Sequence, residues 1–219
     1  MSPAVIELRQ YTLHPGRRDE LIALFERALV ETQEAEGIDL IGQFVDLDDP
    51  DRFVWVRGFP DMERREASLD RFYSGPVWAE HRQAANATMI DSDDVLLLRP
   101  AAPDSGFAPA DRQVSPPGDA VLVVGVHDRP DGGDLRAVVE TALAAAGLTP
   151  LAVLETEPSS NTFPRLPVRT DGPYVVWFAR SPSPGAAKAA VCRMKSDPVL
   201  GPSRQHLRLS PTPRSRLRP

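Results

Sequence analysis

One residue pattern occurs twice in this chain. The segments FYSGPVWAEHRQ (72–83) and MKSDPVLGPSRQ (194–205) share a serine, a Pro-Val pair and an Arg-Gln pair at matching positions. Comparing the chain with itself at an offset of 122 residues gives ten identities over the thirty positions 54–83, without a gap. Such a match at one fixed offset indicates an internal duplication, and it limits the fold to two similar units.

A proline-rich segment separates the two copies. Residues 100–118 contain five prolines among small and polar residues and show no hydrophobic periodicity, which is typical of a linker. We therefore divide the chain into a first domain (1–100), a linker (101–118) and a degenerate second domain (119–219).

Hydrophobic periodicity predicts the same order of elements in both copies, strand-helix-strand-strand-helix-strand. In the first copy we expect strands at 5–13, 39–47, 52–59 and 94–100, and helices at 14–37, 61–75 and 76–89. In the second we expect strands at 120–128, 150–157, 173–180 and 207–217, and helices at 133–147 and 184–197. This βαββαβ order is that of a ferredoxin-like α+β domain.

A ferredoxin-like sheet leaves one face bare, and a second copy can cover that face. We therefore predict an α/β barrel formed as a pseudo-dimer within the chain, with pairing between two chains as the alternative that the linker length also permits. Alternation along strand 52–59 suggests that its small residues face the helices and its large ones a central cavity. The predicted helix-facing residues are Ile6, Leu8, Val54, Val56 and Gly58, and the predicted cavity residues are Glu7, Arg9, Tyr11, Phe53, Trp55, Arg57 and Phe59.

Three segments of the first copy, in order, resemble the NIPSNAP family. They are IELRQYTLHPG at the start, FVWVRGFPDMERR around the tryptophan strand, and FYSGPVWAEHR at the helix break. The resemblance covers residues 5–100 and implies a domain of the dimeric α/β-barrel superfamily. The second copy departs from it, because it lacks the Pro-Gly after the first strand and has Leu200 in place of Trp78.

Four residues are candidates for chemistry. Tyr11 is the tyrosine of the family motif, and Arg9 on the same face can bind a carboxylate or enolate oxygen. His81 follows the Gly-Pro break and His127 occupies the position of Tyr11 in the second copy, so either can move a proton near neutral pH. Structural alternatives are a hydrogen-bonded buried tyrosine, an Arg9 ion pair with Glu7, and a His81 contact with Glu80.

Four further residues are candidates for ligand binding. Trp55, Arg57, Phe59 and Trp78 would line the cavity, where mixed aromatic and cationic side chains are typical of small-molecule sites. Trp55 can be pocket wall or interface core, or it can stack on a planar ligand, and Arg57 can bind the ligand or form a structural ion pair.

Charge and motif content exclude several function classes. Residues 1–110 carry 11 Arg and 21 Asp or Glu (net −10), and residues 111–219 carry 14 basic and 10 acidic residues (net +4), so the two halves should attract each other. Neither has the strongly basic face that nucleic acid requires, and five arginines after position 203 suggest a solvated tail.

We predict no nucleic-acid or membrane partner, no metal site and no cofactor, since phosphate-loop, dinucleotide and clustered-histidine patterns are missing. With a single cysteine, Cys192, and no secretory pattern at the start, we expect a cytoplasmic protein.

Three functions fit these features. The first is a cofactor-independent enzyme of monooxygenase, isomerase, dehydratase or cyclase type, acting on a planar or carbonyl-bearing metabolite between the sheets, as the superfamily resemblance implies. The second is a metabolite-binding protein without turnover, and the third is a protein-interaction module. An enzyme needs a titratable group near neutrality in a reachable cavity, a binder needs only the cavity, and an interaction module should expose an apolar patch.

Overall fold

The computed structural model describes residues 2–112, 114, 118–130, 132–198 and 200–219. Linker positions 113 and 115–117, and Val199 of the repeated Pro-Val pair, lie outside the described residues. The N-terminal half contains β1 (Val5–Leu13), α1 (Arg18–Leu24), a π-helical turn η1 (Phe25–Leu29), α2 (Val30–Ala35), β2 (Asp39–Asp46), β3 (Arg52–Phe59), α3 (Met62–Ser74), α4 (Pro76–Asn86) and β4 (Met89–Pro100).

The C-terminal half contains β5 (Val121–Asp128), α5 (Leu135–Ala145), β6 (Thr149–Thr156), β7 (Tyr174–Ser181), α6 (Pro184–Met194), the two-residue β8 (Ser196–Asp197) and β9 (Gly201–Pro211). The element order predicted for both halves is therefore observed. The prediction of a last strand at 207–217 is wrong in its bounds, because β9 begins six residues earlier. Within the described part of the chain, no helix has both the length and the apolar character needed to cross a membrane.

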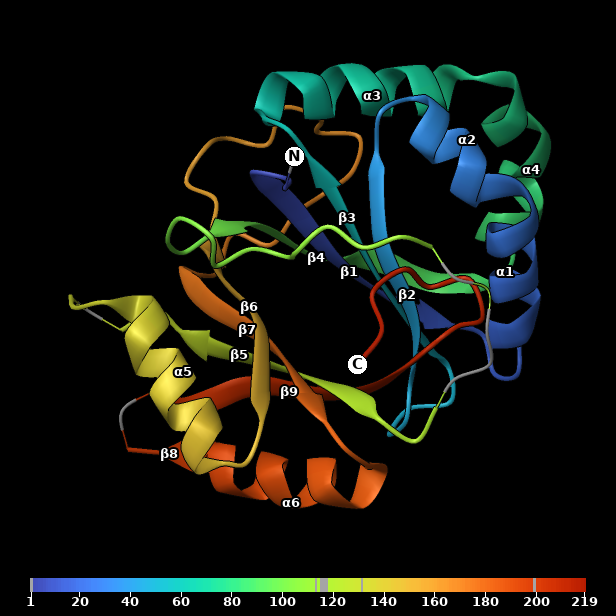
Figure 1. The fold of residues 1–219 in the computed structure, drawn as a ribbon. Helices are drawn as coiled ribbons and strands as arrows, with labels where there is room; N and C mark the ends of the chain where they lie inside the picture. The colour runs from blue at the N-terminus through green and yellow to red at the C-terminus, as the bar shows by residue number, and fades with distance from the viewer. Residues whose placement is uncertain (1, 113, 115–117, 131, 199) are drawn as a thin grey trace.

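The strands close into one barrel. In the part of the chain that the structure describes, eight antiparallel strands follow one another in the order β2-β3-β1-β4-β6-β7-β5-β9, and β9 pairs back with β2. The two junctions between the halves are β4 with β6 and β2 with β9. The helices of the N-terminal half cover one outer side of the barrel, and α5 and α6 cover the opposite side (Figure 1).

The two halves share the details of their strand pairing. The β2–β3 pair has a register shift between Leu40 and Gly42, and the β6–β7 pair has one between Pro150 and Ala152. The two tryptophans are also placed alike, since Trp55 lies across from Arg9 and Trp177 across from Gly125. Equivalent irregularities at equivalent places show that the halves follow the same backbone plan.

The repeated Arg-Gln pair is an exception to this plan. Arg82 and Gln83 lie in α4, whereas Arg204 and Gln205 lie in β9. The chain of the C-terminal half passes from α6 almost directly into its last strand, with no helix among its described residues in the place of α4. The sequence match at these two positions therefore does not join structurally equivalent residues.

The predicted assignment of strand faces is wrong. The barrel interior holds aliphatic and aromatic side chains from both halves, among them Ile6, Leu8, Val54, Val56, Leu122, Val124, Val126, Val176, Leu207 and Leu209. Tyr11, Phe53, Trp55 and Phe59 instead pack under the helices of the N-terminal half. The barrel interior is therefore filled largely with apolar side chains.

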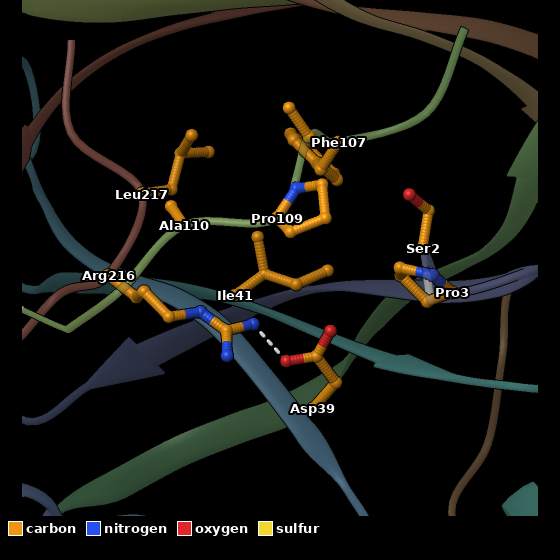
Figure 2. A pocket seen from close by; sticks show the side chains of 10 residues that line it. Ser2, Pro3, Asp39, Ile41, Phe107, Pro109, Ala110, Arg216 and Leu217 are labelled. Atoms are coloured by element: carbon orange, nitrogen blue, oxygen red, sulfur yellow. Dashed lines mark hydrogen bonds and ion pairs between the residues drawn. The ribbon is translucent and has the colours of Figure 1, made fainter. Parts of the chain in front are cut away.

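The linker and the C-terminal tail cover one mouth of the barrel. Phe107 of the linker packs edge-on against Phe178 of β7, with ring centroids 4.9 Å apart, and Leu217 of the tail packs against the same core. Figure 2 shows the hollow of about 290 Å³ that remains there, with Ile41 below these apolar side chains and Arg216 paired with Asp39 at its rim. The only charged groups lining this hollow in the described structure are therefore already paired.

The expectation of a solvated arginine tail is wrong for three of its five arginines, which pair with carboxylates of the N-terminal half. Arg208 pairs with Asp48, Arg214 with Glu31 and Arg216 with Asp39. Tail backbone groups also bond β2, with Thr212 N donating to Gln43 O at 2.9 Å. The acidic N-terminal half therefore holds the basic tail, as the charge asymmetry predicted.

Candidate functional site

An aromatic pocket lies between the sheet and the helices of the N-terminal half. The space between its atoms amounts to about 310 Å³. Most of this space is too narrow for water, because the region that the centre of a water molecule can reach is only about 20 Å³. As it stands the pocket has room for about one water molecule. Its lining residues are Tyr11, Leu21, Phe25, Leu29, Gln33, Trp55, Phe72, Tyr73, Trp78, Ala85 and Met89.

The Gly75-Pro76 break places two aromatic side chains at the edge of this pocket. Gly75 ends α3 with an extended backbone, and Pro76 begins α4 without needing a hydrogen-bonded N–H. A Cβ at Gly75 would lie 3.0 Å from Arg71 O, so the break fits glycine best. The turn brings Tyr73 and Trp78 together edge to face at 5.1 Å, and both remain half-buried. They form the part of the wall that is nearest to solvent.

A buried ion cluster stands behind the pocket. The Glu7 carboxylate accepts from Arg9 Nη1 at 2.8 Å, Arg57 Nε at 2.7 Å and Arg65 Nε at 2.6 Å. All four side chains are at most 1% exposed. Burial alone would raise the pKa of Glu7, but the surrounding guanidiniums hold it far below its usual range. Glu7 is therefore ionised, and three cations share one carboxylate.

This cluster touches the pocket through several of its walls. Arg57 donates to Gln33 Oε1 at 3.3 Å, and its Cζ lies 4.9 Å from the Trp55 ring. Arg9 Nε donates to the Tyr11 hydroxyl at 3.3 Å. Burial raises the pKa of Tyr11 despite the nearby Arg9, so its hydroxyl keeps its proton at neutral pH. Tyr11 can therefore donate a hydrogen bond to an oxygen placed in the pocket.

Several buried donors in this region lack a partner. Trp55 Nε1, Arg57 Nη2 and Arg65 Nη2 make no hydrogen bond to any residue that the structure describes. Buried donors are usually paired, and leaving one unpaired costs about 1–3 kcal/mol. Of these residues Trp55 lines the pocket, and Arg57 and Arg65 belong to the cluster behind it, so one unpaired donor stands in the pocket wall and two stand behind it.

The C-terminal half contributes a loop to this site. Residues 157–173, between β6 and β7, extend to α3 of the N-terminal half (Figure 1). Phe163 of the loop stacks on Tyr73 with ring centroids 6.0 Å apart, and Asn161 Oδ1 accepts from Arg65 Nη1 at 3.0 Å. One half therefore covers the site of the other, which the sequence analysis did not predict.

The corresponding region of the C-terminal half is built differently. Trp177 lies over Gly125, where an added Cβ would come within 2.2 Å of the indole ring. His127 is fully buried beside it, and its Nδ1 is 3.3 Å from Gly201 O. Next to these residues α6 and β9 line an open groove of about 560 Å³, which includes Lys188, Lys195 and His206. Burial lowers the pKa of His206 to about 4, with further lowering by His127 and Lys195.

The structure brings most of the predicted site residues together, but on the unexpected face. Arg9, Tyr11, Trp55, Arg57, Phe59 and Trp78 all belong to the layer between the N-terminal sheet and its helices. His81 does not line the pocket; its Nε2 lies 4.0 Å from Glu80 Oε1 on α4. The expectation that His127 shares a cavity with Tyr11 is wrong, because His127 packs with Trp177 and His206 in the other half.

Arg65, Gln33 and Tyr73 are residues of the site and its cluster that were not predicted from the sequence. Arg65 lies in the charged run MERRE and reads as a surface residue, but it shares the spacing of Leu69 and Phe72 on the buried face of α3. That spacing was the available signal. No cluster of three or more His, Cys, Asp or Glu side chains suited to a metal ion occurs among the described residues.

Comparison with known proteins finds a family match in the N-terminal half. Residues 6–103 match the NIPSNAP family model. Among curated proteins no match is found. A NIPSNAP family protein of unknown function from Agrobacterium tumefaciens is 19% identical, with 45% of this chain aligned to 89% of that one and a TM-score of 0.42.

Two solved structures match nearly the whole chain. One, from Lactobacillus acidophilus and described as a "putative monooxygenase", is 13% identical with a TM-score of 0.56, over 97% of this chain and 94% of that one. The other, from Fusobacterium nucleatum and described in the same words, is 9% identical with a TM-score of 0.57, over 99% and 94%. At these identities the likeness concerns the fold alone.

Proposed function

We propose that the N-terminal half, whose residues 6–103 match the NIPSNAP family model, binds a small planar molecule between its helices and its sheet. The observation that carries this proposal is an aromatic pocket whose wall includes an unpaired buried donor, Trp55 Nε1, with the unpaired Arg57 Nη2 in the cluster behind that wall. An apolar hollow with a few convergent polar groups is the usual form of a small-molecule site. The ligand would supply the missing acceptor, for example a carbonyl oxygen.

Opening of the pocket accompanies binding in this proposal. The free space is too small for an aromatic ring, but Tyr73 and Trp78 are half-buried and lie on either side of the Gly75-Pro76 break. Rotation of these two side chains would admit a flat ligand that then stacks among the aromatic walls. Phe163 of the long loop would move with Tyr73, because the two rings stack.

Binding without turnover is better supported than catalysis. The resolved pKa shifts move Glu7 further down and Tyr11 further up, away from neutrality; the pKa of Arg65 is lowered by burial, but Arg65 does not line the pocket. Proton transfer at neutral pH is most efficient with a group that titrates near that pH. A cofactor-independent enzyme remains the second candidate, favoured by the Arg9–Tyr11 contact, in which the protonated Tyr11 hydroxyl would donate to an enolate oxygen.

We further propose that the chain is a tandem duplication of one ferredoxin-like unit and forms by itself the barrel that such domains otherwise form as dimers. The matched register shifts and the matched caps of α3 and α6 support this. Asp61 accepts from Arg64 N and Ser183 accepts from Ala186 N, again at an offset of 122. A monomer by mass measurement in solution is expected, and an obligate homodimer would contradict this part of the proposal.

A ligand screen tests the binding site. Planar carbonyl and carboxyl fragments would be titrated against the wild type, Tyr11→Phe and Trp78→Leu, with Tyr174→Phe as the matched control. Tyr174 is also a buried tyrosine whose hydroxyl accepts from an arginine, Arg169, at 2.9 Å, but it lies outside the pocket. We expect Tyr11→Phe to weaken binding of hits about tenfold, the loss of one hydrogen bond. Hits that bind both pocket variants as tightly as the wild type would contradict the proposed site.

A further inference from the structure

The ion cluster behind the pocket has a surplus of positive charge. Arg9, Arg57 and Arg65 contribute three positive charges and Glu7 one negative charge, and no other carboxylate bonds any of them within the described chain. Their remaining contacts are to the neutral groups of Tyr11, Gln33, Asn161 and Thr162. Two buried positive charges are therefore left without a partner of opposite charge.

Such a surplus is costly in a protein interior. Moving an ion out of water costs several kcal/mol even after relaxation, and only a close counter-charge offsets that cost. Burial, with repulsion from Arg57 and Arg9, lowers the pKa of Arg65 even though Glu7 is bonded to it. The ring faces of Trp55 and Phe59, 4.9 and 5.6 Å from Arg57 Cζ, attract the guanidinium but do not neutralise it.

The fold itself does not require this charge. On the corresponding strands of the C-terminal half, Val123 pairs with Ala179 just as Glu7 pairs with Arg57. Ala187, at the offset of 122 that relates the helix caps, stands in the place of Arg65 and is fully buried. The same layer of sheet and helix is therefore built there from apolar residues.

We infer that the ligand of the N-terminal pocket is a planar organic anion whose charge lies on oxygen, such as an aromatic carboxylate. The inference rests on the proposed function, since it names the class of ligand for the same pocket. The anion would accept from Trp55 Nε1 in the pocket wall, and its negative charge would offset the surplus of the cluster, whose Arg57 lies against Trp55 and Gln33 of that wall. Charged hydrogen bonds of this kind are roughly twice as strong as neutral ones.

Three isosteric probes test the inference on the wild-type protein. Benzoate, benzamide and benzamidine have nearly the same flat shape and carry charges of −1, 0 and +1. Calorimetric titration should show benzoate binding at least about tenfold more tightly than benzamide, and benzamidine most weakly. Equal affinities for benzoate and benzamide would overturn the inference while leaving the proposed pocket in place. Failure of all three probes to bind would overturn both.

Substituting two neighbouring arginines, one buried and one exposed, distinguishes the effect of the buried charge on benzoate binding from the effect of the net charge of the protein. Arg65→Met removes one buried charge without changing a residue that lines the pocket. Arg64→Met, the matched control, removes one from a side chain that is 72% exposed. We expect Arg65→Met to weaken benzoate about tenfold and to leave benzamide unchanged, and Arg64→Met to change neither. Equal effects of the two substitutions on benzoate would overturn the inference. If Arg65→Met does not fold, the three probes on the wild type still decide.

Discussion

The two halves of this protein share one backbone plan but carry opposite chemistry in the layer between sheet and helices. In the N-terminal half Arg9, across from Trp55, belongs to a buried cluster of one carboxylate and three guanidiniums. In the C-terminal half Gly125, across from Trp177, leaves room for the indole to lie directly on the strand. The comparison indicates that the fold needs the apolar layer and that the charges of the first half serve something else.

The two halves also differ in the helices that cover their sheets. The N-terminal half has α4 after α3, and Trp78 and Ala85 of α4 help to close the pocket. The C-terminal half goes from α6 to β9, and its surface there is an open groove. One half is therefore closed around a polar cluster, and the other is open beside a compact apolar core.

The largest expected effect comes from removing the carboxylate of the cluster. Glu7→Gln would leave three buried guanidiniums without a counter-ion and should lower the free energy of unfolding by about 3–5 kcal/mol. Urea denaturation measures the change. The control is Glu155→Gln, because Glu155 also pairs with two arginines, but these are 45% and 41% exposed. The control should cost no more than about 1 kcal/mol. Similar costs for the two substitutions would mean that the cluster is not effectively buried.

Replacing the whole cluster sharpens the same comparison. A variant with Glu7→Leu, Arg9→Met, Arg57→Met and Arg65→Met should fold, with an unfolding free energy within about 2 kcal/mol of the wild type, because well-packed apolar residues often replace buried ions without loss. It should no longer bind the ligand. A variant that fails to fold would show that the N-terminal half needs the cluster for its fold, and would contradict the conclusion that an apolar layer is sufficient.

The next effect concerns the contact between Trp177 and Gly125. Gly125→Ala would place a Cβ 2.2 Å from the Trp177 ring, and overpacking of this kind should cost about 1–3 kcal/mol. The control is Gly185→Ala in the first turn of α6, where an added Cβ meets nothing within 4 Å. Thermal unfolding of both variants measures the difference. A neutral Gly125→Ala would mean that the indole can move away, and that the C-terminal half is less tightly packed than the structure indicates.

The last prediction is a pH dependence of the C-terminal half. Burial keeps His206 neutral and lowers its pKa to about 4, whereas the unfolded value is 6.5. Between these values the unfolded state binds the proton and the folded state does not, so stability falls as the pH decreases through this window. After allowance for partial exposure, the loss attributable to His206 is on the order of 2 kcal/mol. His206→Gln should remove this part of the pH dependence, and His14→Gln, at an exposed position, should not. An unchanged profile in His206→Gln would contradict the assignment.

The sequence alone determined the order of strands and helices in each half and a part of the candidate site, namely Tyr11, Trp55 and Trp78 of the pocket wall and Arg9 and Arg57 of the cluster behind it. Periodicity, caps and glycine stops are local signals, so they can be read without coordinates. Only the tertiary structure decided which face of each strand turns toward the barrel. The first seven residues of β1 are all buried, because one face packs on helices and the other on the second half. When both faces are covered, alternation along a strand separates its residues into two buried sets. It does not tell which set faces the helices and which faces the barrel interior. The pocket therefore lies between the sheet and the helices and not in the barrel interior, where the sequence predicted it. The loop that covers it belongs to the other half of the chain.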